Sequence, residues 1–386
     1  MNIVYLSPDS HPSYYLFCLR LYQAGGNVLG IGEVHYDNFR QELKEALTEY
    51  YRVENMADYE QLLRTCGYFT HAYGRLDRVA SHNEYLSESE ARLRTDFNIP
   101  GIKIHRLARF NRKSEMKKLF QKAGVAVAKG KVLKNAESAK NFVRDTGYPV
   151  IFKPDRGPGT AATLRVDTDS ELEKFLRVMP SMRYYMEACT EGQLCSFDGL
   201  TDREGGIVFH TVHVYSQGIM ETLKENKDFS YYSLREIPED LETAGRSTVR
   251  AFDIREQFFH IEFFRTPENK IVGLEVNTGP PGGFTTDMFN YANNIDVYRG
   301  WAEILLHNHF PFSCSRPYHC GYIGRKLSKN YMYSHRDIMQ KYGYLIVFHG
   351  PVEAGFCASC GNYAYIVNSQ TPEEMQDVIR FVQATA

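Results

Sequence analysis

The chain lacks a strong net charge, a long hydrophobic run and an export signal. Its 45 basic and 47 acidic residues leave a formal net charge of −2, so the overall balance gives no reason to expect a nucleic acid or an anionic membrane as partner. No apolar run approaches the roughly 20 residues that cross a bilayer. The N-terminus, MNIVYLSPDSHP, has neither the basic nor the long apolar region of a secretion signal. We therefore expect a cytoplasmic protein that binds no nucleic acid and no membrane.

The sequence also lacks internal repeats and low-complexity segments. It lacks the G-x-G-x-x-G fingerprint of dinucleotide-binding folds as well, and this absence argues against an oxidoreductase built on the first domain. The eight cysteines are scattered, as buried small hydrophobic residues often are. The last four include a C-x-x-C pair and could in principle hold zinc, but the first two are separated by five residues, which is loose for a zinc knuckle. We expect these four thiols to bind no metal: Cys314, Cys320, Cys357 and Cys360.

The first part of the chain alternates strands with helices. NIVYLS reads as a strand, Tyr14 to Ala24 as a helix with leucines at helical spacing, and VLGIG as the next strand. A helix from Asp58 to Thr65, followed by YFTHAYG as a strand, would add another unit. Strands that alternate with helices predict a parallel sheet covered by helices, and the length of the chain predicts two or three domains.

The remainder has a mixed α+β pattern. The expected strands are AVAKGKVL, YPVIFKP, RYYMEAC, FFHIEFFR and KIVGLEVN, with a Gly-rich loop, DRGPGTAATLRV, after the second. The expected helices cover residues 136–146, 170–179, 241–252 and 372–382. From RYYMEAC to about Val214 the strands look antiparallel, and the last two strands predict a hairpin.

The predicted hairpin brings acidic and amide side chains together. Glu275 and Asn277 lie two positions apart on one strand, so they share a face. A turn centred on Glu268 and Asn269 places Glu262 opposite Glu275. Like charges opposite each other destabilise a sheet, and a divalent cation between them would remove that cost. The alternative is that one glutamate faces solvent and the other pairs with a lysine or arginine. From spacing alone, the metal site and this alternative are about equally supported.

One lysine is placed where it could bind a phosphate group. Lys153 ends an apolar strand and precedes the Gly-rich loop, and this combination is typical of a phosphate-binding site. The alternative is an exposed lysine beside an ordinary turn. Residues 103–122 are strongly basic, and we expect most of them, Lys117 included, to form a solvated helix face. Glu187 follows the apolar YYM stretch and precedes a short connection that could read an adenine edge; a surface turn is the alternative.

These pieces, in this order, resemble the ATP-grasp superfamily, over roughly residues 105–290. KSEMKKLFQKAGV resembles the segment with the phosphate-contacting lysine, Lys113, and YPVIFKP supplies the second lysine, Lys153. YMEACTEG resembles the adenine-binding hinge, and FHIEFF with LEVN supplies the metal triad. Two departures stand out. Leu194 occupies the position seven residues after the hinge glutamate where many members carry a ribose-binding acid, and NTGPPGG replaces the usual arginine after the asparagine.

The resemblance implies an α/β protein with the ATP-grasp fold, preceded by a parallel αβ domain and completed by a mixed α+β C-terminal part. Its expected units are residues 1–105, 106–185 (small lobe with phosphate flap), 186–310 (large lobe with metal triad) and 311–386. It also implies ATP and Mg²⁺ (or Mn²⁺) as cofactors, with Lys113 and Lys153 as catalytic residues. The implied nucleotide-binding residues are Lys113, Lys153, Gly157, Gly159, Thr160, Glu187, Ala188, Cys189 and Glu191. The implied metal ligands are Glu262, Glu275 and Asn277.

The activity implied by the resemblance is that of a carboxylate–amine ligase, which activates a small carboxylate as an acyl phosphate and joins it to an amine or another nucleophile. The alternative is a protein of the same fold that binds nucleotide without catalysis. Small carboxylate and amine substrates are the expected partners, and a homodimer is a candidate assembly. The flap after Lys153 would close over the nucleotide and exclude water. Three basic residues are candidates for binding substrate: Arg265, Arg299 and Arg325.

Overall fold

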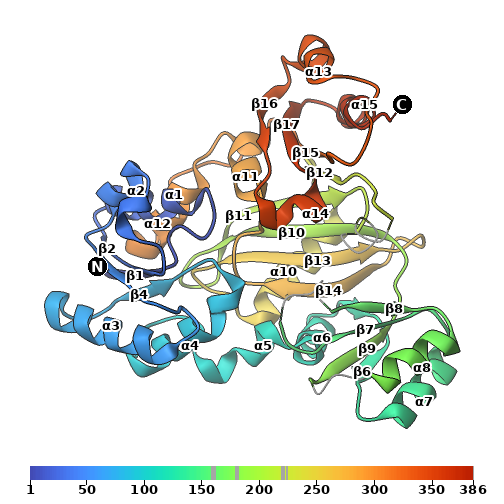
Figure 1. The fold of residues 1–386 in the computed structure, drawn as a ribbon, viewed down its shortest axis with the longest axis horizontal. Helices are drawn as coiled ribbons and strands as arrows, with labels where there is room; N and C mark the ends of the chain where they lie inside the picture. Colours follow the sequence, from blue (N-terminus) through green and yellow to red (C-terminus); the bar gives the residue numbers. More distant parts are fainter. Residues whose placement is uncertain (158–161, 179–181, 219–221, 223–224, 386) are drawn as a thin grey trace.

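The computed structural model describes residues 1–157, 162–178, 182–218, 222 and 225–385. Three sheets organise the chain: a four-stranded sheet at the N-terminus, a second four-stranded sheet in the middle of the sequence, and a nine-stranded sheet between them in space (Figure 1). No helix within the described ranges is long and apolar enough to cross a membrane. This arrangement confirms the predicted α/β class with a parallel N-terminal sheet.

The N-terminal sheet is parallel and has the strand order β3-β2-β1-β4. Its strands are β1 (Asn2–Leu6), β2 (Asn27–Gly32), β3 (Glu49–Arg52) and β4 (Arg78–Ala80). Its helices are α1 (Tyr14–Gln23), α2 (Gln41–Ala46), α3 (Tyr59–Tyr73) and α4 (Ser87–Asp96), with short 3₁₀ turns η1 (Tyr36–Asn38) and η2 (Glu84–Leu86).

The strand expected at YFTHAYG is wrong, because these residues continue α3. Their aromatic and β-branched side chains favour a strand when they are considered alone. In the structure, Leu62, Cys66 and Phe69 recur at helical spacing and are buried in the core beneath the sheet. Tertiary packing therefore overrides local strand propensity, and the strand of this unit is β4 instead.

The middle sheet and its two helices form what we call the small lobe. Its strand order is β6-β9-β7-β8, and its hydrophobic core, which includes Phe142, Phe152 and Phe175, is a cluster of its own. The strands are β6 (Gly130–Val132), β7 (Val150–Pro154), β8 (Leu164–Val166) and β9 (Tyr184–Ala188), and the helices are α7 (Ala136–Thr146) and α8 (Asp169–Arg177). The segment expected as one strand, AVAKGKVL, is divided: β5 (Ala126–Val127) joins the large sheet and β6 the small lobe.

The large sheet has the order β16-β17-β15-β12-β11-β10-β13-β14-β5 and is antiparallel except for the pair β14–β5. Its further strands are β10 (Gln193–Thr201), β11 (Ile207–Tyr215), β12 (Ser230–Ser233), β13 (Phe258–Arg265), β14 (Ile271–Asn277), β15 (His319–Arg325), β16 (Ile346–Pro351) and β17 (Tyr363–Ser369). The helices that accompany it are α10 (Glu239–Phe252), α11 (Thr285–Asn293), α12 (Val297–His307), α13 (His335–Tyr342), α14 (Cys357–Cys360) and α15 (Pro372–Val382), with the 3₁₀ turn η4 (Ala354–Phe356).

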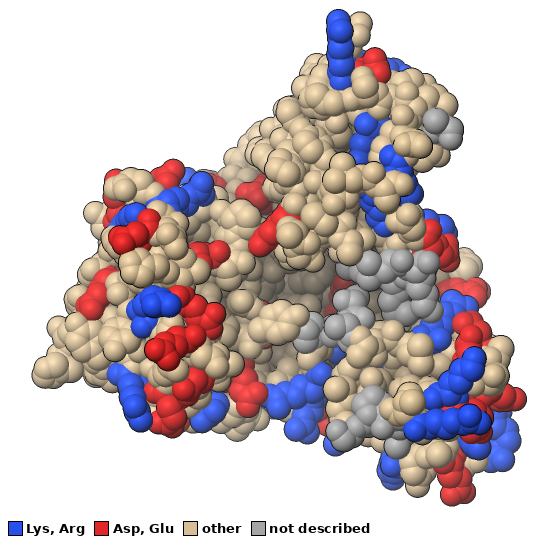
Figure 2. All heavy atoms as spheres, in the orientation of Figure 1, with Lys and Arg blue, Asp and Glu red and all other residues tan. Residues whose placement is uncertain are grey.

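Short elements connect the N-terminal part to the small lobe: η3 (Ile104–Arg106), α5 (Ala108–Asn111) and α6 (Lys113–Lys122). The N-terminal sheet is also fixed to the large sheet through α12, whose Trp301 packs at 5.2 Å from the ring of Phe17 in α1. Figure 2 shows a hollow where the N-terminal part, the C-terminal part and the small lobe meet.

Candidate functional site

The hairpin β13–β14 has the register that the sequence predicted. Glu262 is the partner of Glu275, and His260 is the partner of Asn277, with an irregularity in the pairing just after Glu262. The turn closes through a hydrogen bond from the Asn269 amide to the Thr266 carbonyl (2.9 Å), with Asn269 at a positive φ of 58°. The two carboxylates therefore lie next to each other on the paired strands of the hairpin.

Lys113 joins the hairpin to the start of the Gly-rich loop. Its ammonium group lies 3.3 Å from Glu275 Oε1 and donates a hydrogen bond to the carbonyl of Gly157 (2.8 Å), although the side chain is only 1% exposed. The beginning of α6 is held in place by Asp155, which accepts hydrogen bonds from the amide and the hydroxyl of Ser114 (2.8 and 3.0 Å). A buried cation thus stands between the predicted metal ligands and the predicted flap.

A second cationic centre is formed by two lysines on one carboxylate. Lys153 Nζ lies 2.5 Å from Glu187 Oε1, and Lys117 Nζ lies 3.1 Å from Glu187 Oε2. All three side chains are about 5% exposed. Burial alone would raise the pKa of Glu187, but the ammonium groups of Lys117 and Lys153 lower it to about 2. The group carries one positive charge in excess, which makes it suitable for an anion.

The expectation that Lys117 belongs to a solvated basic face is wrong. Its ammonium group also donates a hydrogen bond to the carbonyl of Gly273 on β14 (3.0 Å), and the residue is 4% exposed. Burial lowers the pKa of Lys117, an effect that the Glu187 carboxylate opposes. Helical spacing alone did not show this, because the groups that cover Lys117 come from β9 and β14, which are distant in sequence.

The other predicted nucleotide-binding residues surround β9. Glu187 and Ala188 end this strand, and the Ala188 and Cys189 amides donate to the carbonyls of Lys129 (2.8 Å) and Pro149 (3.2 Å). Glu191 follows in the connection to β10. Gly157 has a positive φ of 100°, and Gly159 and Thr160 lie outside the described residues. Their role in binding nucleotide stays a prediction.

Leu194, at the position where a ribose-binding acid was considered, is buried in an apolar cluster with Tyr215 and Phe264. It therefore presents no polar group to a sugar.

A polar array behind the hairpin was missed by the sequence analysis. The carboxylate of Asp198 on β10 lies close to two histidines. Its Oδ2 is 2.7 Å from His213 Nδ1, and its Oδ1 is 2.5 Å from His260 Nδ1. The other ring nitrogen of His260, Nε2, lies 3.4 Å from Glu262 Oε1. Asp198 and His213 are fully buried. Burial alone would lower the pKa of His260, but Asp198 outweighs it and raises the pKa to about 10. The available signal was an aspartate within the apolar run LCSFDGL.

The hollow contains a cleft of about 540 Å³, within the usual size of small-molecule sites. Several separate parts of the chain build it, among them the N-terminal loops, α5, the hairpin with its NTGPPG continuation, α12 and the segment around η4. Its lining includes Tyr14, His82, Glu84, His260, Asn277 and Glu353. Desolvation, together with the negative charge of Glu275, raises the pKa of Glu84. The sequence analysis did not single out Glu84, because its proximity to the hairpin depends on how two sheets pack.

The three basic residues expected to bind substrate are not in the cleft. Arg265 pairs with Asp240 (2.6 Å), and Arg299 lies 3.6 Å from Glu303. Arg325 donates to the carbonyl of Val382 (2.6 Å) at the C-terminal end of the chain. Binding of substrate by any of the three stays a prediction, which these contacts do not support.

The donor set of the hairpin fits a hard divalent cation in part. Among the described residues, no group of three or more His, Cys, Asp or Glu side chains is placed so that it could hold a metal ion by itself. Glu262, Glu275 and Asn277 supply carboxylate and amide oxygens, and water and phosphate oxygens would complete an octahedral Mg²⁺ shell. The neighbouring Lys113 and His260 offset part of the negative charge of these carboxylates.

Comparisons with known proteins bear on the fold of the chain. Residues 112–188, which include Lys113, Lys153 and strand β9, match the family model of the carbamoyl-phosphate synthase L chain ATP binding domain. An L-amino acid ligase from Bacillus licheniformis has a similar structure, with a TM-score of 0.76 at 14% identity over 98% of this chain and 96% of that one. The chain has an ATP-grasp fold.

Other proteins with the ATP-grasp fold extend the comparison. The biotin carboxylase domain dimer of 2-oxoglutarate carboxylase from Hydrogenobacter thermophilus, solved with MgADP, ADP and bicarbonate, gives a TM-score of 0.72 at 16% identity over 98% and 88% of the two chains. An L-arginine-specific L-amino acid ligase from Bacillus subtilis is 21% identical over 61% of this chain and 59% of its own length. The chain spans 38%, 19% and 59% of the lengths of three curated relatives that it matches.

Proposed function

We propose that this protein is an ATP- and Mg²⁺-dependent ligase that activates a small carboxylate as an acyl phosphate and joins it to an amine. The observation that carries the proposal is that two buried lysines lie near the carboxylates of one hairpin. Lys113 Nζ lies 3.3 Å from Glu275 Oε1. Lys153 Nζ lies 2.5 Å from Glu187 on β9, and it is close enough to Glu275 and Glu262 for their charges to raise its pKa against the effect of burial. Ammonium groups beside hard-oxygen ligands suit a phosphoryl group and its metal.

The proposed function assigns separate roles to the lysines, the hairpin ligands and the histidine behind them. Lys153 and Lys113 would bind the phosphates and offset the charge that spreads over the oxygens of the transferring group. Glu262, Glu275 and Asn277 would hold Mg²⁺, which neutralises phosphate charge and aligns the phosphates for in-line attack. Asp198 would fix the ring of His260, and His260 in turn would fix the orientation of Glu262, so the ligand does not rotate away from its position.

The reaction has two steps. A carboxylate oxygen attacks the γ-phosphorus, the bond to the β-phosphate oxygen breaks, and ADP leaves. The amine nitrogen then attacks the acyl carbon, phosphate leaves, and the nitrogen loses a proton. Glu84 would accept this proton, since its raised pKa brings it closer to that of a useful base. Closure of the loop after Lys153 would keep water from the acyl phosphate.

Amino acids are the first substrates to test, since two proteins similar to this chain are named amino acid ligases. We expect the protein to act in the cytoplasm, where ATP and Mg²⁺ are supplied, and to form a homodimer, as a neighbour of the same fold does. The assay combines ATP, Mg²⁺ and pooled amino acids and measures ADP, phosphate and new condensation products by mass spectrometry.

A protein that binds nucleotide without catalysis is the second candidate, and the apolar Leu194 at the hinge favours it. It would bind ATP in the same assay and release no ADP with any pool. ADP release that depends on an added amino acid, with a stoichiometric product, would exclude this second candidate.

A further inference from the structure

Two carboxylates of the cleft have no partner in the described part of the chain. Glu84 and Glu353 line the cleft, and neither side chain forms a hydrogen bond or an ion pair with another described residue. They lie in different surroundings: Glu84 senses the charges of Glu275, Lys113 and Glu262, whereas Glu353 is close enough to Tyr14 to raise the pKa of that phenol. The cleft therefore has one acidic group beside the reacting centre and another beside the N-terminal loop.

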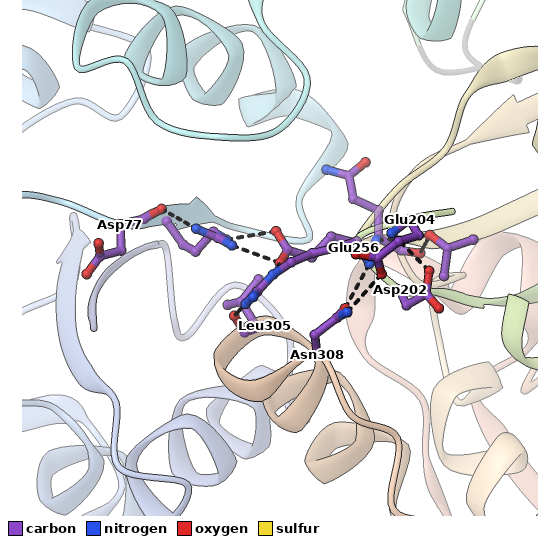
Figure 3. Close-up of polar contacts among 10 residues, drawn as sticks. Asp77, Asp202, Glu204, Glu256, Leu305 and Asn308 are labelled. Atoms are coloured by element: carbon purple, nitrogen blue, oxygen red, sulfur yellow. Dashed lines mark hydrogen bonds and ion pairs between the residues drawn. The ribbon is translucent and has the colours of Figure 1, made fainter. Parts of the chain in front are cut away.

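The arginines of the cleft wall do not balance this charge, because each is engaged with another carboxylate. Arg78 donates two hydrogen bonds to Glu256, at 2.7 and 2.8 Å, and Figure 3 shows Glu256 at the centre of this polar junction. The other two pairs are Arg94 with Glu90 (2.7 Å) and Arg255 with Asp253 (2.5 Å). The cleft thus offers a positively charged ligand two acidic groups that no arginine neutralises.

The histidines of the cleft do not balance the negative charge of Glu84 and Glu353 either. Burial lowers the pKa of His11 to about 4 and that of His82 to about 3, so both rings are neutral at pH 7. His260 is charged, but it is held between Asp198 (2.5 Å) and Glu262 (3.4 Å).

Aromatic rings lie beside the second carboxylate. Tyr14 packs against His11 with ring centroids 5.0 Å apart, and His11 contacts Phe356 at 6.2 Å. Below them, His82 lies 4.6 Å from Trp301, and its Nε2 atom is buried without a hydrogen-bond partner. Glu353 is near Tyr14, and Phe356 lines the same cleft. A carboxylate beside aromatic rings is an arrangement that binds organic cations.

We propose that this cleft selects a substrate with a second, permanently cationic group, a guanidinium or an alkylammonium, in addition to the amine that reacts. The distal cation would lie at Glu353 between Tyr14 and Phe356, and the reacting amine would lie at Glu84, near Asn277. This proposal rests on the ligase function for its reaction, but the binding of the cation does not require catalysis. A basic amino acid is the smallest common molecule that carries both groups.

The test is isothermal titration of the full-length protein, in the presence of Mg²⁺ and a non-hydrolysable ATP analogue. The titrants are two isosteric pairs that differ in side-chain charge: L-arginine with L-citrulline, and L-lysine with L-norleucine. We expect the charged member of at least one pair to bind roughly tenfold more tightly than its neutral isostere. Equal affinities within both pairs, tighter binding of the neutral members, or no binding of either cation would overturn the proposal.

The variant Glu353→Gln tests whether the preference for the charged ligand arises at Glu353. Glu353 is exposed, so the substitution leaves the core intact. We expect it to remove most of the preference for the charged member and to leave the affinity for the neutral isostere unchanged. Glu373→Gln is the matched control, since Glu373 is an exposed glutamate of α15 outside the cleft lining, and it should keep the full preference. Preference that survives Glu353→Gln, or that falls equally in both variants, would refute the assigned position.

A second assay, with ATP in place of the analogue and the same four amino acids, separates this proposal from the ligase function. Charge-selective binding in the titration without release of ADP from ATP in this assay would end the ligase proposal and keep the cation site. Release of ADP that depends only on neutral amino acids would keep the ligase function and end the cation site.

Discussion

Lys117 and Lys153 hold opposite oxygens of one buried carboxylate, Glu187, at 3.1 and 2.5 Å. When Lys153 turns toward a phosphate, Glu187 would be left as a buried anion unless Lys117 stayed with it. An unpaired buried charge costs several kcal/mol, roughly 3–5 when one partner of a buried pair is removed. Lys117 is therefore expected to make the movement of Lys153 possible.

We expect Lys117→Met to weaken ATP binding by at least about tenfold, equivalent to about 1.4 kcal/mol. Calorimetry with Mg²⁺ and ATP analogue measures this, and circular dichroism checks that the fold is retained. Lys118→Met is the control, because the Lys118 side chain is 68% exposed and pairs only with Glu115. Unchanged affinity in the Lys117 variant would show that this lysine has a structural role alone.

Lys153→Ala should lower both nucleotide affinity and turnover, since it removes the ammonium group that the phosphates would meet. Steady-state kinetics of ADP release, at varied ATP, separates the two effects. Lys118→Ala serves as the control for loss of a positive charge on the protein. Equal losses in both variants would mean that only the overall positive charge matters.

Glu275→Gln and Asn277→Ala should abolish metal-dependent turnover, because each removes one hard oxygen ligand from the hairpin. Asn277→Ala should leave the free energy of unfolding nearly unchanged, whereas Glu275→Gln also removes the carboxylate partner of the buried Lys113 and should lower it. Turnover is measured across a range of Mg²⁺ concentrations. Glu268→Gln, in the turn of the same hairpin, is the control. Near-normal turnover at low Mg²⁺ in either variant would contradict the assignment of the triad.

The buried pair of Asp198 and His260 predicts a pH dependence of stability. The pKa of His260 is raised to about 10 from an ordinary value near 6.5, so between these values the folded state binds the proton that the unfolded state has lost. The stability from this proton is complete below about pH 6.5 and decreases as pH rises toward 10. Urea unfolding at several pH values between 7 and 10 measures the decrease. His260→Gln should flatten it, and an identical slope in the variant would refute the assignment.

Much of the hairpin could be predicted from sequence, because its geometry is local. A short turn at Glu268 and Asn269 fixes the register, and alternation along the strand fixes which side chains share a face. The same holds for the helices α7 and α15, whose bounds the structure confirms.

What could not be predicted depends on contacts between distant segments. The burial of Lys117 follows from Glu187 and Gly273, which lie on strands of two different sheets. The array around Asp198 requires β10 to lie between β11 and β13, an order that strand periodicity alone does not contain. The cleft is assembled from several separate parts of the chain, so neither Glu84 nor Glu353 stands out in its own segment.

The contact between the N-terminal and large sheets has a consequence for the order in which substrates bind. The two sheets share one hydrophobic core, which includes Phe17, Phe258 and Trp301, and Glu256 adds ion pairs to Arg78 and Arg203 at their junction (Figure 3). The small lobe has a separate core. The proposed amine cleft is lined mainly by these two joined parts, whereas Lys113 and Lys153, the lysines proposed to bind nucleotide, lie where the small lobe meets the large sheet. We therefore expect the amine cleft to exist before nucleotide arrives and the two substrates to enter in either order.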